Sequence, residues 1–372
     1  MLASRFMDLL GADFYTGVPD SLLHPLCVSI LERYGTDPRH HVIGVNEGAC
    51  AGMAAGYFLA TGHVPVLYLQ NSGEGNLINP LASLMHRRVY SLPAILVVGW
   101  RGEPGVHDEP QHVYQGEITC QLLTDMQIPF QVLSAESTEE DVLAWMKTFR
   151  PELEQGHPVA FVVRKNALTT PVRHAFSNPY AMTRERAIEH IVEYTGTCPI
   201  VSTTGKASRE LFELREKRGE DHARDFLTVG SMGHAASIAL GLALQKRDTR
   251  VFCLDGDGAV LMHMGCLATI GQAKCENLVH LVINNGAHET VGGLPTAGFD
   301  ADLGAVARAC GYRHVLLAVS ETELEDALRH LPESGPVFLE IRCALGARAD
   351  LGRPTTTPIE NRDAFMRFLQ TK

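Results

Sequence analysis

The sequence predicts an α/β protein made of two doubly wound parallel-sheet domains, and three observations carry this prediction. Short apolar runs rich in β-branched residues alternate with longer helical patterns along the chain, which favours parallel strands joined by right-handed crossovers. The length of 372 residues is that of two domains of ordinary size. A polar stretch that carries Pro171 and Pro179 and lacks sustained periodicity divides the alternation into two halves.

Six strand candidates fall in each half. In the first half they are residues 14–18, 42–45, 66–69, 95–99, 130–133 and 159–163, and in the second half 200–203, 226–229, 251–254, 279–283, 314–317 and 337–341. Helical patterns such as residues 50–59 and 141–148 lie between them. We therefore expect one domain at residues 1–170, a linker at 171–182 and a second domain at 183–372.

Composition and charge exclude several classes of function. The net charge of −11 would repel a nucleic acid. The longest apolar runs have the length of buried strands and are too short to span a membrane. The first ten residues lack the pattern of a signal peptide, so we expect a cytoplasmic protein. The nine cysteines form no Cys-x-x-Cys pair, which favours reduced core residues over a metal site.

Two polar clusters follow neighbouring strand candidates in the second half. Gly256-Asp257-Gly258 comes after the strand that ends at Leu254, and Asn284-Asn285 comes after the strand at 278–283; a turn at 255–258 and a helix at about 261–274 are expected between them. Both clusters then lie at the carboxyl ends of parallel strands, where open α/β sheets bind ligands. Glycines admit a phosphate, and Asp257 with either Asn suits Mg²⁺. Taken singly, each cluster is more often an ordinary turn or loop.

The joint occurrence of these clusters resembles the signature of the thiamine-diphosphate-dependent enzymes. The resemblance implies a pyrimidine-binding domain followed by a diphosphate-binding domain. It implies that Asp257, Asn285 and the backbone carbonyl of Ala287 bind Mg²⁺. It also implies that the diphosphate lies against Gly256, Gly258 and Ala259.

Two further segments fit the same resemblance. Glu47 stands near the start of a helix that follows a strand, and in this family such a glutamate hydrogen-bonds the pyrimidine ring of the cofactor. Residues 230–233 (Gly-Ser-Met-Gly) resemble the segment that braces the bent cofactor, so that Gly230, Ser231 and Met232 are expected to contact it. Thr204 and Lys206, at a strand-to-helix turn, are additional candidates for cofactor binding.

Beyond the cofactor motifs, the chain is similar over essentially its full length to the phosphonopyruvate decarboxylases. The segments that carry this similarity are residues 17–21 (Gly-Val-Pro-Asp-Ser), 100–105 (Trp-Arg-Gly-Glu-Pro-Gly), 108–112 (Asp-Glu-Pro-Gln-His), 208–211 (Ser-Arg-Glu-Leu), 263–265 (His-Met-Gly), 288–293 (His-Glu-Thr-Val-Gly-Gly) and 351–354 (Leu-Gly-Arg-Pro). The resemblance implies decarboxylation of 3-phosphonopyruvate to phosphonoacetaldehyde and CO₂ in phosphonate biosynthesis. The related sulfopyruvate decarboxylases usually divide the two domains between subunits, so a fused chain favours the phosphonate enzyme. Leu294, directly after Gly292-Gly293, departs from the family pattern, because we expect a polar residue at this position.

Acid–base groups and cations complete the expected site. By the same resemblance Asp20 and His112 are the acid–base candidates, although the local alignment also allows Ser21. His288 and Glu289, just beyond the metal loop, are further acid–base candidates. A substrate with a carboxylate and a phosphonate requires cations, and Arg101, Arg209 and Arg353 are candidates for binding the phosphonate. Lys206 could contact the cofactor diphosphate or the substrate, and His288 is a further candidate for substrate contact. Each arginine has a surface ion pair as its alternative role.

The resemblance places the cofactor at a subunit interface, so we expect at least a homodimer. Three alternatives stay open: a decarboxylase of sulfopyruvate or another 2-keto acid, a carboligase, and a noncatalytic α/β binding module. The sequence lacks a Gly-x-Gly-x-x-Gly dinucleotide loop and a Walker loop. The module is therefore the weakest of the three.

Overall fold

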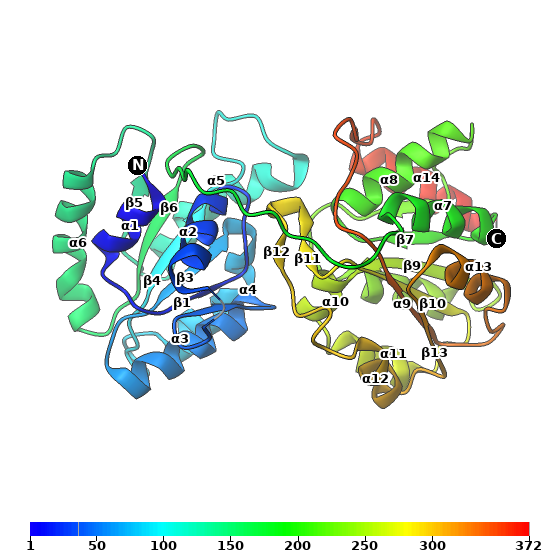
Figure 1. Ribbon diagram of the computed structural model, residues 1–372, viewed down its shortest axis with the longest axis horizontal. Coiled ribbons are helices and arrows are strands. Elements are labelled where there is room, and N and C mark those ends of the chain that lie inside the picture. Colours follow the sequence, from blue (N-terminus) through cyan, green and yellow to red (C-terminus); the bar gives the residue numbers. More distant parts are fainter. Residues whose placement is uncertain (36, 372) are drawn as a thin grey trace. The chain divides into compact units, whose positions relative to one another are not determined.

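The computed structural model describes residues 1–35 and 37–371. It divides into two units, Met1–Ala175 (unit 1) and Phe176–Lys372 (unit 2). Each unit is a six-stranded parallel sheet with helices on both faces (Figure 1). This confirms the predicted α/β class with parallel sheets. Across the described residues, no helix is both long enough and apolar enough to cross a membrane.

In unit 1 the strands alternate with helices along the chain. The strands are β1 (Tyr15–Gly17), β2 (His41–Ile43), β3 (Val66–Gln70), β4 (Ile95–Gly99), β5 (Phe130–Leu133) and β6 (Val159–Val163). The helices are α1 (Ala3–Leu10), α2 (His24–Tyr34), α3 (Glu47–Thr61), α4 (Glu74–Asn79), α5 (Pro110–Asp125) and α6 (Glu139–Glu154), with a 3₁₀ turn at Asn71–Gly73 and a π-helical turn at Pro80–Leu84. Helix α1 packs against α2 and α6 on one face of the sheet, whereas α3 packs against α4 on the other (Figure 1).

Unit 2 repeats this alternation and adds a short antiparallel ribbon. Its parallel strands are β7 (Ile200–Ser202), β8 (Asp225–Leu227), β9 (Val251–Gly256), β10 (Leu278–Asn284), β13 (His314–Ala318) and β14 (Val337–Arg342); the ribbon consists of β11 (Ala287–His288) and β12 (Leu294–Pro295). The helices are α7 (Arg184–Thr195), α8 (Lys206–Lys217), α9 (Ala235–Gln245), α10 (Asp257–Met262), α11 (Cys266–Ala273), α12 (Leu303–Cys310), α13 (Glu321–Arg329) and α14 (Pro358–Gln370), with a 3₁₀ turn at Glu289–Val291.

The two sheets share one strand order. It is β2-β1-β3-β4-β6-β5 in unit 1 and β13-β14-β10-β9-β7-β8 in unit 2, which is the same order once the strands of each unit are counted from its own start. In unit 1, β2 and β3 lie on opposite sides of β1, and in unit 2, β8 and β9 lie on opposite sides of β7. The order in which strands are added to the sheet therefore reverses between β1 and β3 and between β7 and β9. Open α/β sheets bind ligands at such switch points, outside the carboxyl ends of the strands.

The core of each unit lies on both faces of its central strands. Strands β4 and β6 in unit 1 and β10 in unit 2 are buried at every position. Helices cover both faces of a parallel sheet, so such strands are apolar runs without polar alternation. This explains why all twelve predicted strands are present, with ends shifted by a few residues.

Three local features differ from the expectations. The turn predicted at 255–258 is absent because β9 continues to Gly256 and α10 begins at Asp257. The helix predicted at 261–274 is two helices, α10 and α11, separated at residues 263–265, where the Cys266 amide donates back to the His263 carbonyl. The β11–β12 ribbon was not predicted, since two-residue strands show no periodicity. Leu294 in β12 is fully buried, so an apolar residue suits this position.

Candidate functional site

Asp257 lies at the carboxyl end of β9 and is almost completely buried. Burial raises the pKa of its carboxyl group to about 6, although hydrogen bonds from the Thr296 hydroxyl and from backbone amides, including that of Asn285, act in the opposite direction. These partners are all neutral. A carboxylate in this setting gains from a nearby cation, because burial penalises its charge.

The two adjacent asparagines at the end of β10 have different surroundings. Asn284 is fully buried; its Nδ2 donates to the Gly298 carbonyl at 2.6 Å and to Glu340 at 2.9 Å, and its Oδ1 accepts from the Gly286 amide at 3.1 Å. Its amide is thus occupied in holding the loop. Asn285 Oδ1 accepts from the Ala287 amide at 3.1 Å, and an amide oxygen has a second lone pair.

Glu289 is the centre of a charged network beside Asn285. Its carboxylate accepts from Arg184 Nη1 at 2.6 Å, from Lys206 Nζ at 3.0 Å and from Asn285 Nδ2 at 2.7 Å. Arg184 also forms a two-bond ion pair with Glu210, at 2.6 and 2.8 Å. Burial raises the pKa of Glu289, but the neighbouring Arg184 and Lys206 outweigh burial and the net pKa is lowered. Glu289 therefore stays ionised and serves poorly as a general acid.

The loop of residues 230–233 is held in an unusual backbone conformation. Gly230, Ser231 and Gly233 have φ values of 73°, 47° and 88°, a region that favours glycine. A Cβ placed on Gly258 would lie 3.2 Å from Met232 Cε and 3.5 Å from the His288 ring. Met232 and His288 therefore flank Gly258 closely.

His288 and Thr204 lie beside the loops at the carboxyl ends of the unit 2 strands. Burial lowers the pKa of His288 to about 4, so its ring is neutral at physiological pH. Thr204 lies after β7, and its hydroxyl accepts from the Gly230 amide at 3.2 Å. The carboxyl ends of β7, β9 and β10 thus share one edge with the loops that contact them.

In unit 1, Glu47 is the first residue of α3, and Asn46 caps this helix by accepting from the amides of Gly48 and Ala49. Glu47 is almost completely buried. Burial raises the pKa of its carboxyl group, and a hydrogen bond from Asn76 partly offsets this increase. A Cβ on Gly73 would lie 2.3 Å from Glu47 Oε1. Only glycine allows the backbone to approach the carboxylate so closely.

A second polar group lies at the carboxyl ends of β1, β3 and β4 in unit 1. Asp20 is fully buried, and it accepts from Gln70 Nε2 at 2.6 Å and from the backbone amides of Leu22 and Leu23 at 2.8 and 3.2 Å. Ser21 instead accepts from Arg101 Nη1 at 3.1 Å. Of these two neighbours, Asp20 is fully buried and Ser21 is only partly buried.

Arg101 and His112 lie near Asp20. Arg101 pairs with Asp108 through Nε and Nη2, at 2.8 and 2.5 Å, which raises the pKa of the guanidinium and commits most of its donors. His112 on α5 is buried, and burial together with the Arg101 charge lowers its pKa. Within residues 1–35 and 37–371, Nδ1 of His112 has no hydrogen-bond partner. A neutral histidine with a free ring nitrogen can exchange a proton with a bound molecule.

The other two arginine candidates are placed differently. Arg209 is partly buried on α8, one turn after Lys206, and Arg353 is exposed in the segment before α14. The amide of the neighbouring Gly352 donates to Glu213 at 2.6 Å.

Several polar residues that join these groups were not predicted from the sequence, namely Gln70, Asn76, Arg184 and Thr296. Gln70 and Asn76 could have been found, because residues 70–76 are a polar run directly after an apolar strand. Arg184 and Thr296 do not follow an apolar strand of the parallel sheet. Arg184 begins α7 and Thr296 follows the β11–β12 ribbon, so no local sequence pattern indicates that they reach the carboxyl edge of the unit 2 sheet. Glu74 in the same polar run is also buried, and burial raises its pKa to about 8.

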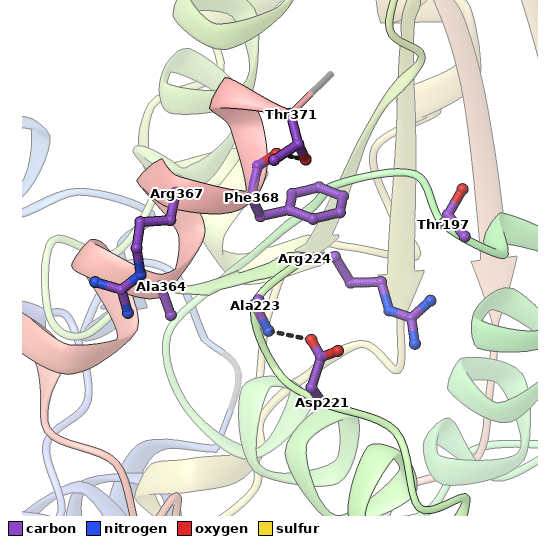
Figure 2. A pocket seen from close by; sticks show the side chains of 8 residues that line it. All are labelled: Thr197, Asp221, Ala223, Arg224, Ala364, Arg367, Phe368 and Thr371. Carbon is purple, nitrogen blue, oxygen red and sulfur yellow. Dashed lines mark hydrogen bonds between the residues drawn. The ribbon is translucent and has the colours of Figure 1, made fainter.

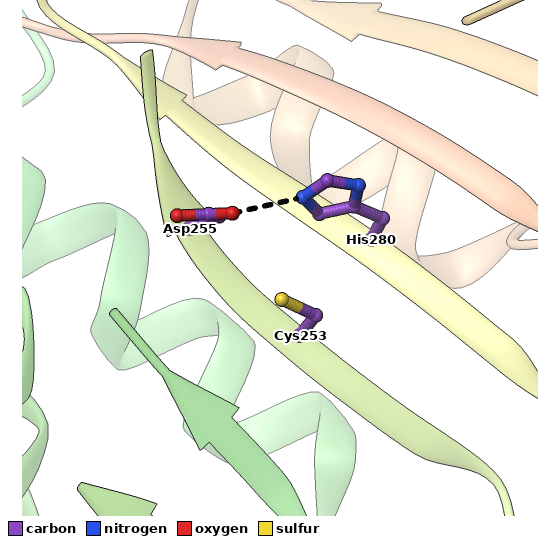
Figure 3. Close-up of side chains that lie close together, drawn as sticks. All are labelled: Cys253, Asp255 and His280. Atoms are coloured by element: carbon purple, nitrogen blue, oxygen red, sulfur yellow. Dashed lines mark hydrogen bonds and ion pairs between the residues drawn. The ribbon is translucent and has the colours of Figure 1, made fainter. Parts of the chain in front are cut away.

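A buried Cys-Asp-His cluster lies behind this edge in unit 2. Cys253, Asp255 and His280 offer possible ligand atoms within 4.8 Å of one another on β9 and β10 (Figure 3). His280 Nε2 lies 3.3 Å from Asp255, and Nδ1 lies 3.0 Å from the Tyr312 hydroxyl. The first of these contacts ties β9 to β10, the two strands that lead to Asp257 and Asn285.

A surface hollow of about 410 Å³ lies elsewhere on unit 2. Figure 2 shows Arg224, Arg367 and Phe368 among its lining side chains. Arg224 precedes β8, and Thr197, which also lines the hollow, precedes β7. The hollow is therefore at the amino ends of these strands, opposite the edge that carries Asp257 and Asn285.

Comparison with protein families matches both units. The model described as "Thiamine pyrophosphate enzyme, N-terminal TPP binding domain" matches residues 2–124, and the model described as "Thiamine pyrophosphate enzyme, C-terminal TPP binding domain" matches residues 203–341. The first range contains Glu47, and the second contains Asp257 and Asn285.

Curated relatives match over most of the chain. A phosphonopyruvate decarboxylase of Streptomyces viridochromogenes is 38% identical over 97% of this chain and 92% of its own length. A phosphonopyruvate decarboxylase of Streptomyces hygroscopicus is 36% identical over 96% of this chain and 91% of its own length. A sulfopyruvate decarboxylase of Methanosarcina acetivorans is 26% identical over 75% of each chain.

Proposed function

Because the chain belongs to the thiamine pyrophosphate enzyme family, and within it to the phosphonopyruvate decarboxylases, we propose that it decarboxylates 3-phosphonopyruvate to phosphonoacetaldehyde and CO₂ with thiamine diphosphate and Mg²⁺. The observation that carries this proposal is the 38% identity to a named phosphonopyruvate decarboxylase over 97% of the chain. Subunits of sulfopyruvate decarboxylases reach 37–38% identity, but over only 38–42% of this chain, and a single-chain sulfopyruvate decarboxylase reaches 26% over 75%. The nearly full-length match at 38% supports the phosphonate substrate.

The residues present fit the metal and the diphosphate. Asp257 is a buried carboxylate with neutral hydrogen-bond partners, and carboxylate, amide and carbonyl oxygens are the ligands that Mg²⁺ prefers. We assign the metal to Asp257, Asn285 Oδ1 and the Ala287 carbonyl. Gly256, Gly258 and Ala259 would accommodate the diphosphate, with Thr204 and Lys206 as further polar contacts.

The residues of unit 1 fit the pyrimidine ring and the proton transfers. When bound, thiamine diphosphate supplies a cationic ring that accepts the electron pair released as CO₂ departs. Glu47 would hydrogen-bond the pyrimidine ring; its raised pKa keeps its proton available to higher pH than in an exposed glutamate. His112, neutral and with an unpaired Nδ1 among the described residues, would hold or deliver a proton at that atom. Asp20, fixed by Gln70 and two amides, would orient neighbouring groups.

The substrate carries carboxylate and phosphonate groups, so its recognition needs cations. Arg101, Arg209 and Arg353 are the proposed cationic ligands, and His288, whose ring is neutral at physiological pH, is a proposed uncharged contact. Arg101 already donates to Asp108 through Nε and Nη2. Its Nη1, which donates to the Ser21 hydroxyl, is therefore the donor that could most easily turn to the substrate. Alanine variants of the three arginines test this assignment: at least one should raise KM for phosphonopyruvate with little change in kcat. Unchanged KM in all three would contradict it.

We further infer that the active enzyme is a homodimer in which one copy supplies Glu47 and the other supplies the metal-binding residues. Sedimentation coupled to an activity measurement tests this inference. Full activity in a monomeric species would contradict it. The reaction would serve phosphonate biosynthesis by converting phosphonopyruvate to phosphonoacetaldehyde, with loss of its carboxylate as CO₂.

Incubation of the purified protein with phosphonopyruvate, with and without thiamine diphosphate and Mg²⁺, tests the main proposal. Aldehyde should form only when both are present. Parallel incubations with sulfopyruvate and pyruvate separate the related decarboxylases, and an added aldehyde acceptor reveals carboligation. Aldehyde formation without cofactor, or none from phosphonopyruvate under any condition, would end the proposal.

A further inference from the structure

We propose that Glu289 is a positioning residue: its carboxylate fixes the orientation of the Asn285 amide, so that Oδ1 rather than Nδ2 is presented to the metal. This inference rests on the proposed function, in which Asn285 is a metal ligand. It assigns to Glu289 a role other than acid–base catalysis.

The contacts around Asn285 define a single orientation of its amide group. A carboxylate can only accept hydrogen bonds, so Glu289 Oε2, at 2.7 Å, requires the NH₂ group of Asn285 on its side. A backbone amide can only donate, so the Ala287 N–H, at 3.1 Å, requires the oxygen on the other side. Rotation of the amide by 180° would set oxygen against carboxylate and NH₂ against N–H. Both partners therefore turn Oδ1 toward Ala287, whose carbonyl is the third proposed ligand.

Glu289 must itself be held rigidly to serve in this way. Arg184 Nη1 donates to Oε2 of Glu289 at 2.6 Å, and Lys206 Nζ donates to Oε1 at 3.0 Å. Glu210 in turn anchors Arg184 through two bonds at 2.6 and 2.8 Å. Two basic and two acidic side chains thus pair within one network.

Asn284 provides the comparison within the same turn. Its amide also donates to a buried glutamate, Glu340, at 2.9 Å, and Glu340 also contacts an arginine, Arg342, at 2.8 Å. However, Asn284 Nδ2 and Oδ1 are both committed to the loop, at Gly298 and Gly286. Removal of Glu340 should therefore loosen the fold without changing which atom faces the metal.

Two substitutions separate hydrogen bonding from charge. Glu289→Met keeps the length of the side chain and removes every acceptor, whereas Glu289→Gln removes the charge and keeps one acceptor that can serve Asn285. The measurement is Mg²⁺ binding by the full-length protein at saturating thiamine diphosphate, followed by intrinsic fluorescence and calorimetry rather than by turnover. Circular dichroism and Tm show that each variant is folded.

We expect Glu289→Met to weaken Mg²⁺ about 10- to 100-fold, the usual effect of losing a residue that orients a metal ligand, and Glu289→Gln to stay within about threefold of wild type, because it keeps the acceptor. Glu340→Met should lower Tm with Mg²⁺ affinity near that of wild type. Equal losses in the Met and Gln variants would show that charge, not orientation, matters and would overturn the proposal. So would wild-type affinity in Glu289→Met, or an equal loss in Glu340→Met.

The wild-type titration distinguishes this inference from the function on which it rests. If the wild-type chain fails to bind thiamine diphosphate with Mg²⁺, the proposed function fails. If it binds both and Glu289→Met binds them equally well, only the positioning role fails.

Discussion

Asn76 Nδ2 donates a hydrogen bond to Oε2 of Glu47 at 2.7 Å, and this contact joins the start of α4 to the start of α3. It fixes one oxygen of the carboxyl group, while Gly73 leaves space for the other. The same contact lowers a pKa that burial raises. Asn76 therefore controls both the direction of the Glu47 carboxyl group and the ease with which it ionises.

Substitutions at Glu47 and Asn76 should reduce decarboxylation to different extents. Glu47→Gln should lower kcat by about 10²- to 10⁴-fold, the usual contribution of a general acid or base. Asn76→Ala should lower it by roughly tenfold, since a hydrogen bond to an ionisable group contributes about 1.5 kcal/mol. Steady-state kinetics checks both, and Asn79→Ala, an exposed residue of the same helix, is the matched control. Equal kinetics of Asn76→Ala and Asn79→Ala would contradict the assigned role.

Glu47→Gln should also raise Tm at neutral pH. The folded state keeps the Glu47 proton at a pH where the unfolded chain has lost it, so stability decreases as pH rises through the interval between the two pKa values. Glutamine mimics the neutral form and removes that penalty. A lower Tm for this variant at pH 7 would show that the ionised carboxylate is stabilised in the fold.

Glu74 should impose a pH-dependent loss of stability on unit 1. Burial raises its pKa from 4.5 to about 8, and among the described residues its Oε1 has no hydrogen-bond partner. The penalty should grow between pH 4.5 and about 8 and reach roughly 4 to 5 kcal/mol above that range, at 1.36 kcal/mol per unit. Urea unfolding of wild type and Glu74→Gln at pH 5, 7 and 9 tests this. The variant should gain stability relative to wild type with rising pH, and parallel pH curves would refute the prediction.

Removal of the metal should release the cofactor. Thiamine diphosphate and Mg²⁺ together should raise the unfolding free energy of the wild type by about 2.7 kcal/mol at a ligand concentration of 100 times Kd, and excess EDTA should reverse the gain. Asp257→Ala should show no such gain, whereas Asp300→Ala, an exposed acid in the neighbouring loop, should behave like wild type. Thermal unfolding with each combination of ligands measures these effects. Cofactor stabilisation that persists in EDTA would argue against a metal-held diphosphate.

The ion pair of Arg215 and Asp225 should be important for the stability of unit 2. Both side chains are fully buried, and Nε and Nη2 of Arg215 contact the carboxylate at 2.8 and 3.0 Å. Arg215→Met should cost about 3 to 5 kcal/mol because it leaves a buried charge unpaired, and the double variant with Asp225→Leu should recover most of that loss. Arg186→Met, which breaks an exposed pair with Glu321, should cost less than about 1 kcal/mol. Urea unfolding of the single and double variants measures these losses of stability. If the losses of the two single variants simply add in the double variant, the pairing of Arg215 with Asp225 is contradicted.

The sequence allowed prediction of those parts of the fold and site that depend on local patterns. Strand positions followed from apolar runs, and the placement of Asp257 and the Asn284-Asn285 pair at one edge followed from the rule that neighbouring parallel strands end together. The choice of Asn285 as a metal ligand came from the family resemblance and stays a prediction. Asn76 and Arg184 could not be assigned roles in this way, because they reach their partners from helix starts far away in the chain. The preference for Asn285 over Asn284 is supported by the partners of the two amides, which no spacing reveals.

Each of the two parallel sheets is built from the strands of one unit, which bears on how the chain can be divided. Within residues 1–35 and 37–371, every parallel strand pairs with strands of its own unit, so a break between Ala175 and Phe176 removes no strand-to-strand hydrogen bond described there. Residues 1–175 and 176–372, produced together as two polypeptides, should therefore each complete a sheet and a core. On this basis the covalent link serves to keep the two halves in equal amounts and at high local concentration, and not to complete either fold.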